Sequence, residues 1–181
     1  MNKVVTSWDT RWSYVNVWEA KGIEGSRPAW SVSLIIKKND PCIEKIKAAI
    51  KAAYDDGKDV LKGNSKTVPA FEAISNPLND GDIKRSDDPA YAGAYYINAK
   101  NYQNGPGIVD RDRQEILDRS EIYSGCYGRA CISFYAYNKN GNKGIGCTLL
   151  HLQKGRDGEH LGGSYVSIEE AFGDDEDDFL S

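Results

Sequence analysis

Two segments of this 181-residue chain place tyrosines and cationic side chains on one face of an expected β-strand. Alternation along residues 127–138 separates a small, apolar set from a second set. That second set is Tyr127, Arg129, Cys131, Ser133, Tyr135 and Tyr137. Residues 94–102 repeat the pattern with Tyr96, Asn98, Lys100 and Tyr102. Unpaired bases stack on aromatic rings at about 1–3 kcal/mol per base while Lys and Arg contact phosphates, so the pattern favours a surface for single-stranded nucleic acid.

A single tyrosine of this kind is equally consistent with a core residue whose hydroxyl reaches water. The inference therefore depends on the set of residues and not on any one of them. Duplex DNA offers no exposed base faces, which is why the pattern favours a single strand. Preference between DNA and RNA, site size and self-association as a homodimer stay open.

The last nine residues, 173–181, contain five consecutive acids and an aromatic residue. The segment's candidate partner-binding residues are Asp174, Asp175, Glu176, Asp177, Asp178 and Phe179. The whole chain has 23 Lys and Arg against 27 Asp and Glu, and removing the five acids leaves 23 against 22. Such a block is typical of a disordered tail that competes for the anion site of the body or docks on a basic partner. A merely solubilising tail is the alternative.

Composition and length indicate one globular domain over residues 1–172, followed by the tail at 173–181. No apolar run is long enough for a membrane span and no signal peptide is recognisable, so we expect a cytoplasmic protein with reduced cysteines and no membrane partner. Cys147 and His151 would lie about 13 Å apart on a strand, too far to share zinc with Cys126 and Cys131. We expect no metal and no cofactor.

Five segments have strand chemistry, and they indicate a mainly β fold. They are residues 12–20, 29–37, 94–102, 127–139 and 143–154. Asn140 and Gly141 predict the hairpin turn between the last two. Asp40 and Pro41 open a helix that buries Ile43, Ile46, Ile50 and Ala53. Residues 55–92 read as a long loop with one short element near 67–74. This order predicts a small five-stranded barrel with an inserted helix and extra loops.

Two other functions have weaker support. Residues 110, 112, 115, 118 and 121 are acidic and suggest ligands of a Mg²⁺-dependent nuclease, but arginines at 111, 113 and 119 lie between them as ion-pair partners. A DNA mimic or acidic interaction module is the third class, although its acids would not be confined to one tail. The glycines at 141, 144 and 146 form a hairpin and not a phosphate loop, since no helix follows them. Neither histidine has a nucleophile partner, so a hydrolase has no support. We expect no enzyme.

Several segments together resemble a known family over nearly the whole chain. They are residues 13–19 (SYVNVWE), 30–36 (WSVSLII), 124–129 (SGCYGR), 134–138 (FYAYN), 140–144 (NGNKG) and 157–159 (DGE), with the acidic-Phe tail. The chain is similar to the bacteriophage single-stranded DNA-binding proteins of oligonucleotide-binding (OB) fold, of the T7 type. The resemblance implies a non-enzymatic protein of DNA replication, recombination or repair that coats single strands. Its tail is expected to contact phage or host replication proteins and to shield the DNA groove.

Strand alternation and charge, on the segments that the resemblance covers, assign the candidate DNA-binding residues. They are Tyr14, Lys37, Tyr96, Lys100, Tyr102, Arg129, Tyr135, Tyr137 and Lys143.

Overall fold

In the computed structural model, which describes residues 2–22 and 24–161, all five expected strands are present. They are β2 (Arg11–Lys21), β3 (Ala29–Lys37), β5 (Ala94–Asn101), β7 (Tyr127–Lys139) and β8 (Asn142–Arg156). β-Branched and aromatic residues fill these strands, and Asn140 and Gly141 adopt positive φ in the turn between β7 and β8. The predicted mainly β fold is therefore confirmed.

The strand pairings form a ring of OB type. β2 pairs with β3, β3 with β5 and β7 with β8, all antiparallel and over many residues. Single pairs close the ring, Lys100 with Thr148 between β5 and β8 and Arg11 with Tyr127 between β2 and β7. Three short strands extend the sheet: β1 (Lys3–Val5) beside β7, β4 (Asn79–Asp80) beside β5, and β6 (Gly107–Val109) beside β8.

The inserted helix α1 (Cys42–Asp56) packs its apolar stripe against the sheet. Ile43, Ile46, Ile50 and Ala53 are all buried, as the sequence predicts. The helix starts just after the predicted Asp40–Pro41 pair, and Asp40 still satisfies its end, because Asp40 Oδ1 accepts the Cys42 N–H at 2.9 Å. Trp12, Leu34 and Ile132 fill the interior of the ring.

Residues 55–92 contain more structure than the sequence indicates. The segment forms α2 (Lys58–Lys62), α3 (Gly81–Lys84) and 3₁₀ turns at Phe71–Ala73 and Pro89–Tyr91; a third such turn, Arg119–Glu121, precedes β7. Gly and Pro residues, among them Gly57, Gly63 and Pro77, separate these short pieces and explain why the sequence looks like a loop. Within the described part of the chain, no helix has the length and apolarity needed to cross a bilayer.

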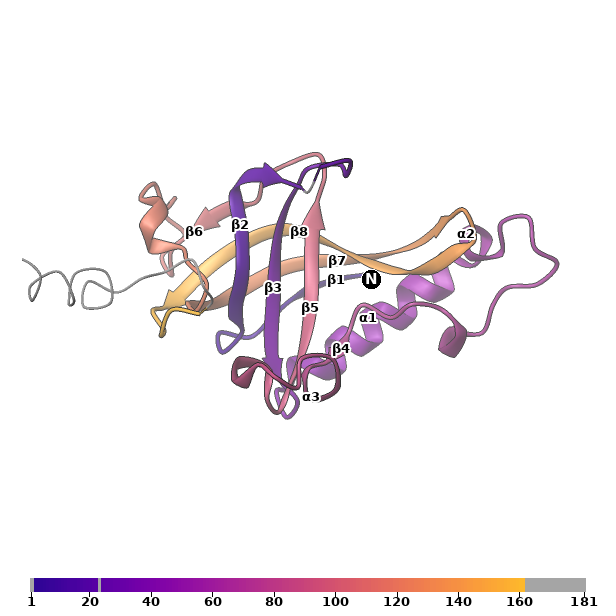
Figure 1. Cartoon of the computed structure of the whole chain (residues 1–181), viewed down its shortest axis with the longest axis horizontal. Helices are drawn as coiled ribbons and strands as arrows, with labels where there is room; N and C mark the ends of the chain where they lie inside the picture. Colours follow the sequence, from indigo (N-terminus) through magenta and orange to yellow (C-terminus); the bar gives the residue numbers. More distant parts are fainter. Residues whose placement is uncertain (1, 23, 162–181) are drawn as a thin grey trace, which may run out of the picture.

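β7 and β8 are the longest strands, with 13 and 15 residues, and they form a ribbon that extends past the rest of the sheet. Figure 1 shows the hairpin end of this ribbon projecting beyond β5 toward α2, while its other end lies near β6. A ribbon of this length gives the molecule two separate ends on which side chains gather.

Candidate nucleic-acid interface

A groove lies between β5 and the hairpin end of the β7–β8 ribbon, and we call it the tyrosine groove. Its first hollow, of about 320 Å³, is lined by residues of β5, β7, β8 and the loop before β4, among them Lys100, Tyr102, Tyr135 and Tyr137. Its second hollow, of about 530 Å³, shares Lys100 and Tyr102. The β2–β3 connection and the hairpin supply the rest of that second hollow, including Lys21, Arg27 and Lys139.

Glycines on β8 explain how the hairpin tyrosines lie. Tyr135 pairs with Gly146 and Tyr137 with Gly144 across the ribbon. A Cβ on Gly146 would meet Tyr135 Cζ at 2.4 Å, and one on Gly144 would meet the Tyr137 hydroxyl at 2.6 Å. Each ring therefore rests on glycine backbone, and Tyr135 keeps 44% of its surface exposed. A ring supported on one side and open on the other suits base stacking.

The groove is electropositive. Every charged residue that lines its two hollows, among the described residues, is Lys or Arg. The Arg27 guanidinium lies 5.3 Å and the Lys139 ammonium 5.8 Å from the centre of the Tyr102 ring. Burial raises the pKa of the Tyr135 hydroxyl, which disfavours the anionic phenolate beside a phosphate.

Four predicted residues meet in this groove, and one predicted residue is excluded from base stacking. Lys100, Tyr102, Tyr135 and Tyr137 line it together. Tyr96, by contrast, is only 5% exposed and packs edge-on against Tyr91 with ring centres 5.0 Å apart. Alternation placed Tyr96 on the correct face of the strand, but Tyr91 covers that face. The prediction that the Tyr96 ring stacks on a base is therefore wrong.

Tyr14 and Lys37 lie outside the groove. Tyr14 is 54% exposed and has φ of +48° at an irregularity in β2, a conformation rare for residues other than glycine. The Arg85 guanidinium covers its ring at 5.2 Å and donates to its hydroxyl at 3.3 Å. Lys37 is exposed at the last position of β3, the end of that strand farther from the Arg27 connection.

Lys143 and Arg129 are also separated from the groove. Lys143 pairs with Asn138 and donates to Ser65 Oγ at 2.9 Å, because alternation points it to the opposite face of the hairpin from Tyr137. Arg129 lies on the same face of β7 as Tyr135, but six residues away, or about 20 Å along the strand. There it donates to Gln153 Oε1 at 2.6 and 3.2 Å.

Sequence reasoning missed three cations of the groove, Lys21, Arg27 and Lys139. Lys21 and Arg27 lie just outside the strands predicted at 12–20 and 29–37, and Lys139 is the last residue of the strand predicted at 127–139. The available signal was the order of the strands. In a five-stranded ring of this type the first connection and the last hairpin approach the same place, so cations flanking both turns are brought together.

The acidic residues suggested for a nuclease are used for local structure. Asp110 Oδ1 accepts the backbone N–H groups of Asp112 and Gln114, and Asp118 accepts that of Ser120. The sequence predicted that the arginines of this segment pair with its own acids. Arg119 instead forms an ion pair with Glu19 of β2. Within residues 2–22 and 24–161, no three His, Cys, Asp or Glu side chains are grouped to hold a metal ion.

All four cysteines are free thiols, and three are buried. The acidic tail, Asp174 to Phe179, lies outside the described residues.

Comparison with known proteins identifies relatives over most of the chain. A family model described as Enterobacter phage Enc34, ssDNA-binding protein, matches residues 2–180. Protein p50 of Acyrthosiphon pisum secondary endosymbiont phage 1 is 37% identical over 144 residues, which is 76% of this chain and 74% of that protein.

Two solved structures share the fold. The single-stranded DNA-binding protein from bacteriophage Enc34, in complex with ssDNA, superposes with a TM-score of 0.65 at 26% identity over 88% of each chain. The single-stranded DNA-binding protein gp2.5 of bacteriophage T7 has a TM-score of 0.65 at 15% identity over 91% of this chain and 98% of its own, which shows the fold alone. The family resemblance read from the sequence is thereby confirmed, and this chain belongs to the family of the ssDNA-binding protein of Enterobacter phage Enc34.

Proposed function

We propose that this protein binds single-stranded DNA in the tyrosine groove with little sequence preference. The observation that carries the proposal is the joining of three tyrosines, Tyr102, Tyr135 and Tyr137, in one groove whose charged lining is entirely basic. Every base has a π-face, so stacking on tyrosine does not select sequence. The single-stranded DNA-binding protein of bacteriophage Enc34 was solved in complex with ssDNA, which supports single-stranded DNA as the ligand.

Each kind of lining residue has its own role. The rings of Tyr135 and Tyr137, 6.4 Å apart and tilted, stack on bases. Lys100 and Lys139, with Lys21 and Arg27, contact the phosphates that join those bases. Tyr14, Lys37 and Lys143 are exposed or half-buried outside the groove and serve as outlying contacts for a longer strand.

The acidic segment is proposed to act on this groove and on partners. Five consecutive negative charges, at 174–178, compete for the cations that bind phosphate when DNA is absent. When DNA occupies the groove, the same segment is released to contact basic surfaces of phage or host replication proteins. The domain at 1–172 and the segment at 173–181 thus divide DNA binding from partner binding.

The biological setting follows from the family. We place the protein in phage DNA replication, recombination or repair, in the host cytoplasm. It acts by occupying and protecting single strands, without catalysis and without a cofactor. Its expected behaviour with DNA is therefore binding that leaves the strand intact.

A titration tests the proposal directly. Labelled oligonucleotides of about 30 residues, single-stranded and as the matching duplex, are titrated with protein at two salt concentrations in the presence of Mg²⁺. We expect tight binding that prefers the single strand and weakens with salt, because each neutralised phosphate releases counterions. Absence of binding to the single strand would refute the proposal, and cleavage of the DNA would replace it with a nuclease.

A further inference from the structure

A second cationic surface lies at the end of the β7–β8 ribbon opposite the tyrosine groove. We call it the arginine array. It consists of Trp8, Arg11, Arg111, Tyr127, Arg129 and Arg156. Two guanidiniums lie by each ring: those of Arg111 and Arg129 are 4.7 and 4.4 Å from the Trp8 ring centre. Those of Arg11 and Arg156 are 5.2 and 4.1 Å from the Tyr127 ring centre.

The rings of this array are not available to bases. Trp8 rests on Gly155, where a Cβ would meet Trp8 Cε3 at 2.9 Å, and the guanidiniums of Arg111 and Arg129 approach the same ring. Most N–H groups of these guanidiniums make no hydrogen bond within the described residues and can donate to a ligand. Of five N–H groups, Arg111 uses one, to Gly155 O at 3.4 Å, and is otherwise exposed. The array therefore offers N–H edges, which match phosphate oxygens, in place of ring faces.

The array also lacks the carboxylates that would neutralise it. Among the described residues only Arg156 of its four arginines forms an ion pair, with Asp9 at 3.0 Å. Arg11, Arg111 and Arg129 donate to neutral oxygens, such as Gly125 O and Gln153 Oε1. Like charges held beside one ring repel one another, and an anion bound between them relieves that repulsion.

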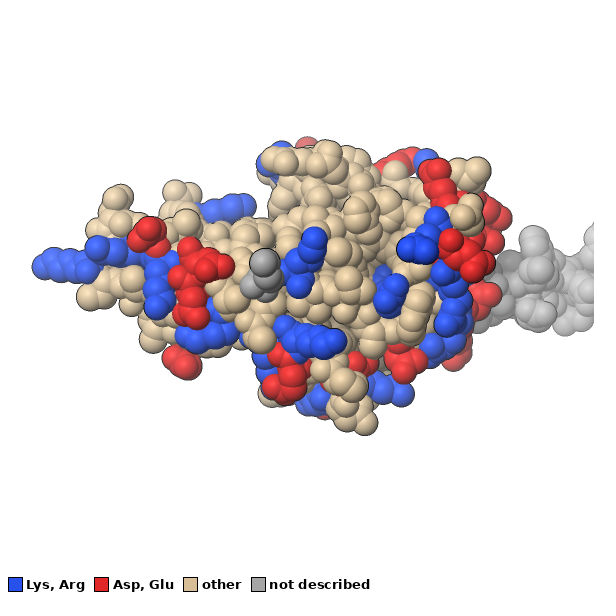
Figure 2. Space-filling model, turned by 180° about the vertical axis from the view of Figure 1, so that it is seen from behind, with Lys and Arg blue, Asp and Glu red and all other residues tan. Residues whose placement is uncertain are grey.

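The strands that run from the array to the tyrosine groove carry no acidic residue. β7, β8 and the neighbouring β1 contain no Asp or Glu at all. The outward side chains between Arg129 and Tyr135 are Cys131 and Ser133, and Lys3 of β1 pairs with Ser133. Figure 2 shows the back of the molecule, where β1 lies: Lys and Arg side chains occur along its middle, and the acidic ones gather around them toward the ends and the lower edge.

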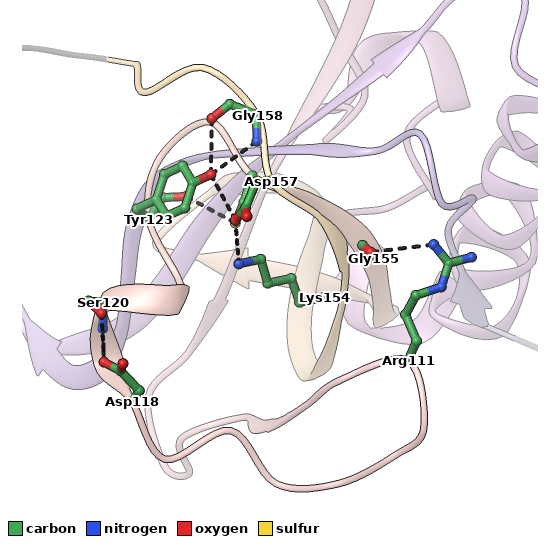
Figure 3. Close-up of polar contacts among 9 residues, drawn as sticks. Arg111, Asp118, Ser120, Tyr123, Lys154, Gly155, Asp157 and Gly158 are labelled. Atoms are coloured by element: carbon green, nitrogen blue, oxygen red, sulfur yellow. Dashed lines mark hydrogen bonds and ion pairs between the residues drawn. The ribbon is translucent and has the colours of Figure 1, made fainter.

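Local contacts hold the array end of β8 in place. Lys154 Nζ donates to Asp157 Oδ1 at 2.6 Å, and the Tyr123 hydroxyl donates to the same carboxylate at 3.0 Å. The Tyr123 hydroxyl also accepts the Gly158 N–H at 3.0 Å. Figure 3 shows these contacts beside the Arg111 side chain, which reaches Gly155 from the loop after β6. The end of β8 that carries Gly155 and Arg156 is thus braced.

We infer that the arginine array is a second nucleic-acid contact, which binds phosphodiester groups of a strand that continues out of the tyrosine groove along the outer face of the ribbon. This inference rests on the proposed function and extends it. The groove recognises bases and phosphates, whereas the array recognises phosphates alone. A short oligonucleotide fills the groove only; a long one also reaches the array, about 20 Å farther along β7.

The test compares two lengths of oligothymidine, about six and about 25 nucleotides, in binding to the full chain and to the double variant Arg111→Gln, Arg129→Gln. Glutamine keeps polarity and most of the side-chain length. Each lost single-strand phosphate contact lowers the slope of log affinity against log salt by about 0.7, so the double variant should lose about 1.4 in slope and roughly tenfold in affinity for the long strand. Binding of the short strand should not change.

Arg113→Gln is the matched control, since Arg113 is exposed in the same loop and contacts neither ring of the array. It should leave both lengths unchanged within about twofold. An unchanged slope for the double variant on the long strand, or equal losses on both lengths, would refute the inference. Tighter binding by the double variant would also refute it, because the array would then hold the acidic segment and not DNA. If the unaltered protein binds neither length, the proposed function itself fails.

Discussion

The two ends of the β7–β8 ribbon combine the same kinds of residue, aromatic, glycine and cationic, but differ in what lies over the aromatic ring. Each end rests an aromatic ring on a glycine of β8, Tyr135 on Gly146 and Trp8 on Gly155. At the hairpin end the Tyr135 ring is 44% exposed, and the groove cations Arg27 and Lys139 lie over Tyr102 instead. At the other end two guanidiniums lie 4.4 and 4.7 Å from the ring centre.

The comparison shows that composition alone does not define a nucleic-acid surface. A tyrosine beside arginines looks the same in sequence whether its ring faces a base or a guanidinium. What separates the two ends is the place of the cations: those of the groove lie over Tyr102 and leave Tyr135 and Tyr137 open, whereas in the array two guanidiniums lie over each ring. The first arrangement leaves π-faces for stacking, and the second leaves N–H groups for phosphates.

The largest effect is expected at the open rings. The double variant Tyr135→Ala, Tyr137→Ala removes two stacking platforms, and at about 1–3 kcal/mol per base it should weaken binding of the short oligothymidine by 30-fold or more. Tyr135→Phe with Tyr137→Phe keeps both rings and should bind within about threefold of the unaltered protein. Equilibrium titration by fluorescence anisotropy measures both.

Thermal melting separates this effect from damage to the fold. Tyr135 is exposed, so its truncation should cost little stability compared with a buried ring such as Tyr91. If the double alanine variant melts far below the unaltered protein, the two rings are structural. If it melts normally and binds DNA equally well, the groove assignment is wrong.

A smaller effect is expected from the glycines that support the rings. In Gly146→Ala the new methyl group would come within 2.4 Å of Tyr135 Cζ, so the ring must shift and one stacking platform is lost. Affinity for the short oligothymidine should then fall by about fivefold to 100-fold. Gly155→Ala displaces Trp8 instead, and it should weaken binding of the long oligothymidine only.

Gly146→Ala and Gly155→Ala are each other's control, since both add one methyl group to the same strand. Titration with the two oligothymidine lengths distinguishes a lost stacking platform from a general loosening of the ribbon. Equal losses from both substitutions on the short strand would show that the two ends do not act separately.

Much of the fold is predictable from the sequence because its signals are local. Alternation located the five long strands, Asn140 and Gly141 located the hairpin, and Asp40 located the start of α1. The short strand β6 was missed because its three residues, Gly107–Val109, are too few to show alternation. Its formation depends on β8, which lies more than 30 residues later in the chain.

The groove is predictable only in part, for the same reason. Lys100, Tyr102, Tyr135 and Tyr137 share strand faces that alternation reveals. Tyr96 has the same parity, but Tyr91 from a 3₁₀ turn covers it. No pattern in the neighbouring sequence predicts that contact. Arg129 lies on the face of β7 that alternation indicates but about 20 Å from the groove, because alternation fixes the face of a strand and says nothing of position along it.

The smallest effect concerns the brace at the array end. The hydrogen bond from Lys154, followed by that from Tyr123, lowers the pKa of Asp157 below its usual 3.8. A carboxyl whose pKa is lowered on folding adds stability above the pKa of the unfolded chain and loses it as the pH falls through the folded value. Asp157→Asn should therefore destabilise the protein at pH 7, by no more than about 0.5 kcal/mol since the carboxylate is mostly exposed, and the difference should disappear as the pH falls through the folded pKa of Asp157.

Urea unfolding at pH 7 and pH 3 measures this difference, with Asp87→Asn as an exposed control outside the brace. DNA binding by Asp157→Asn, measured with the two oligothymidine lengths, compares the two ends of the ribbon. A loosened brace should weaken the long oligothymidine by about twofold and leave the short one unchanged, because the groove shares no contact with Asp157. A change in short-strand binding would mean that the two ends are coupled through the ribbon, and the division between base and phosphate recognition would then have to be abandoned.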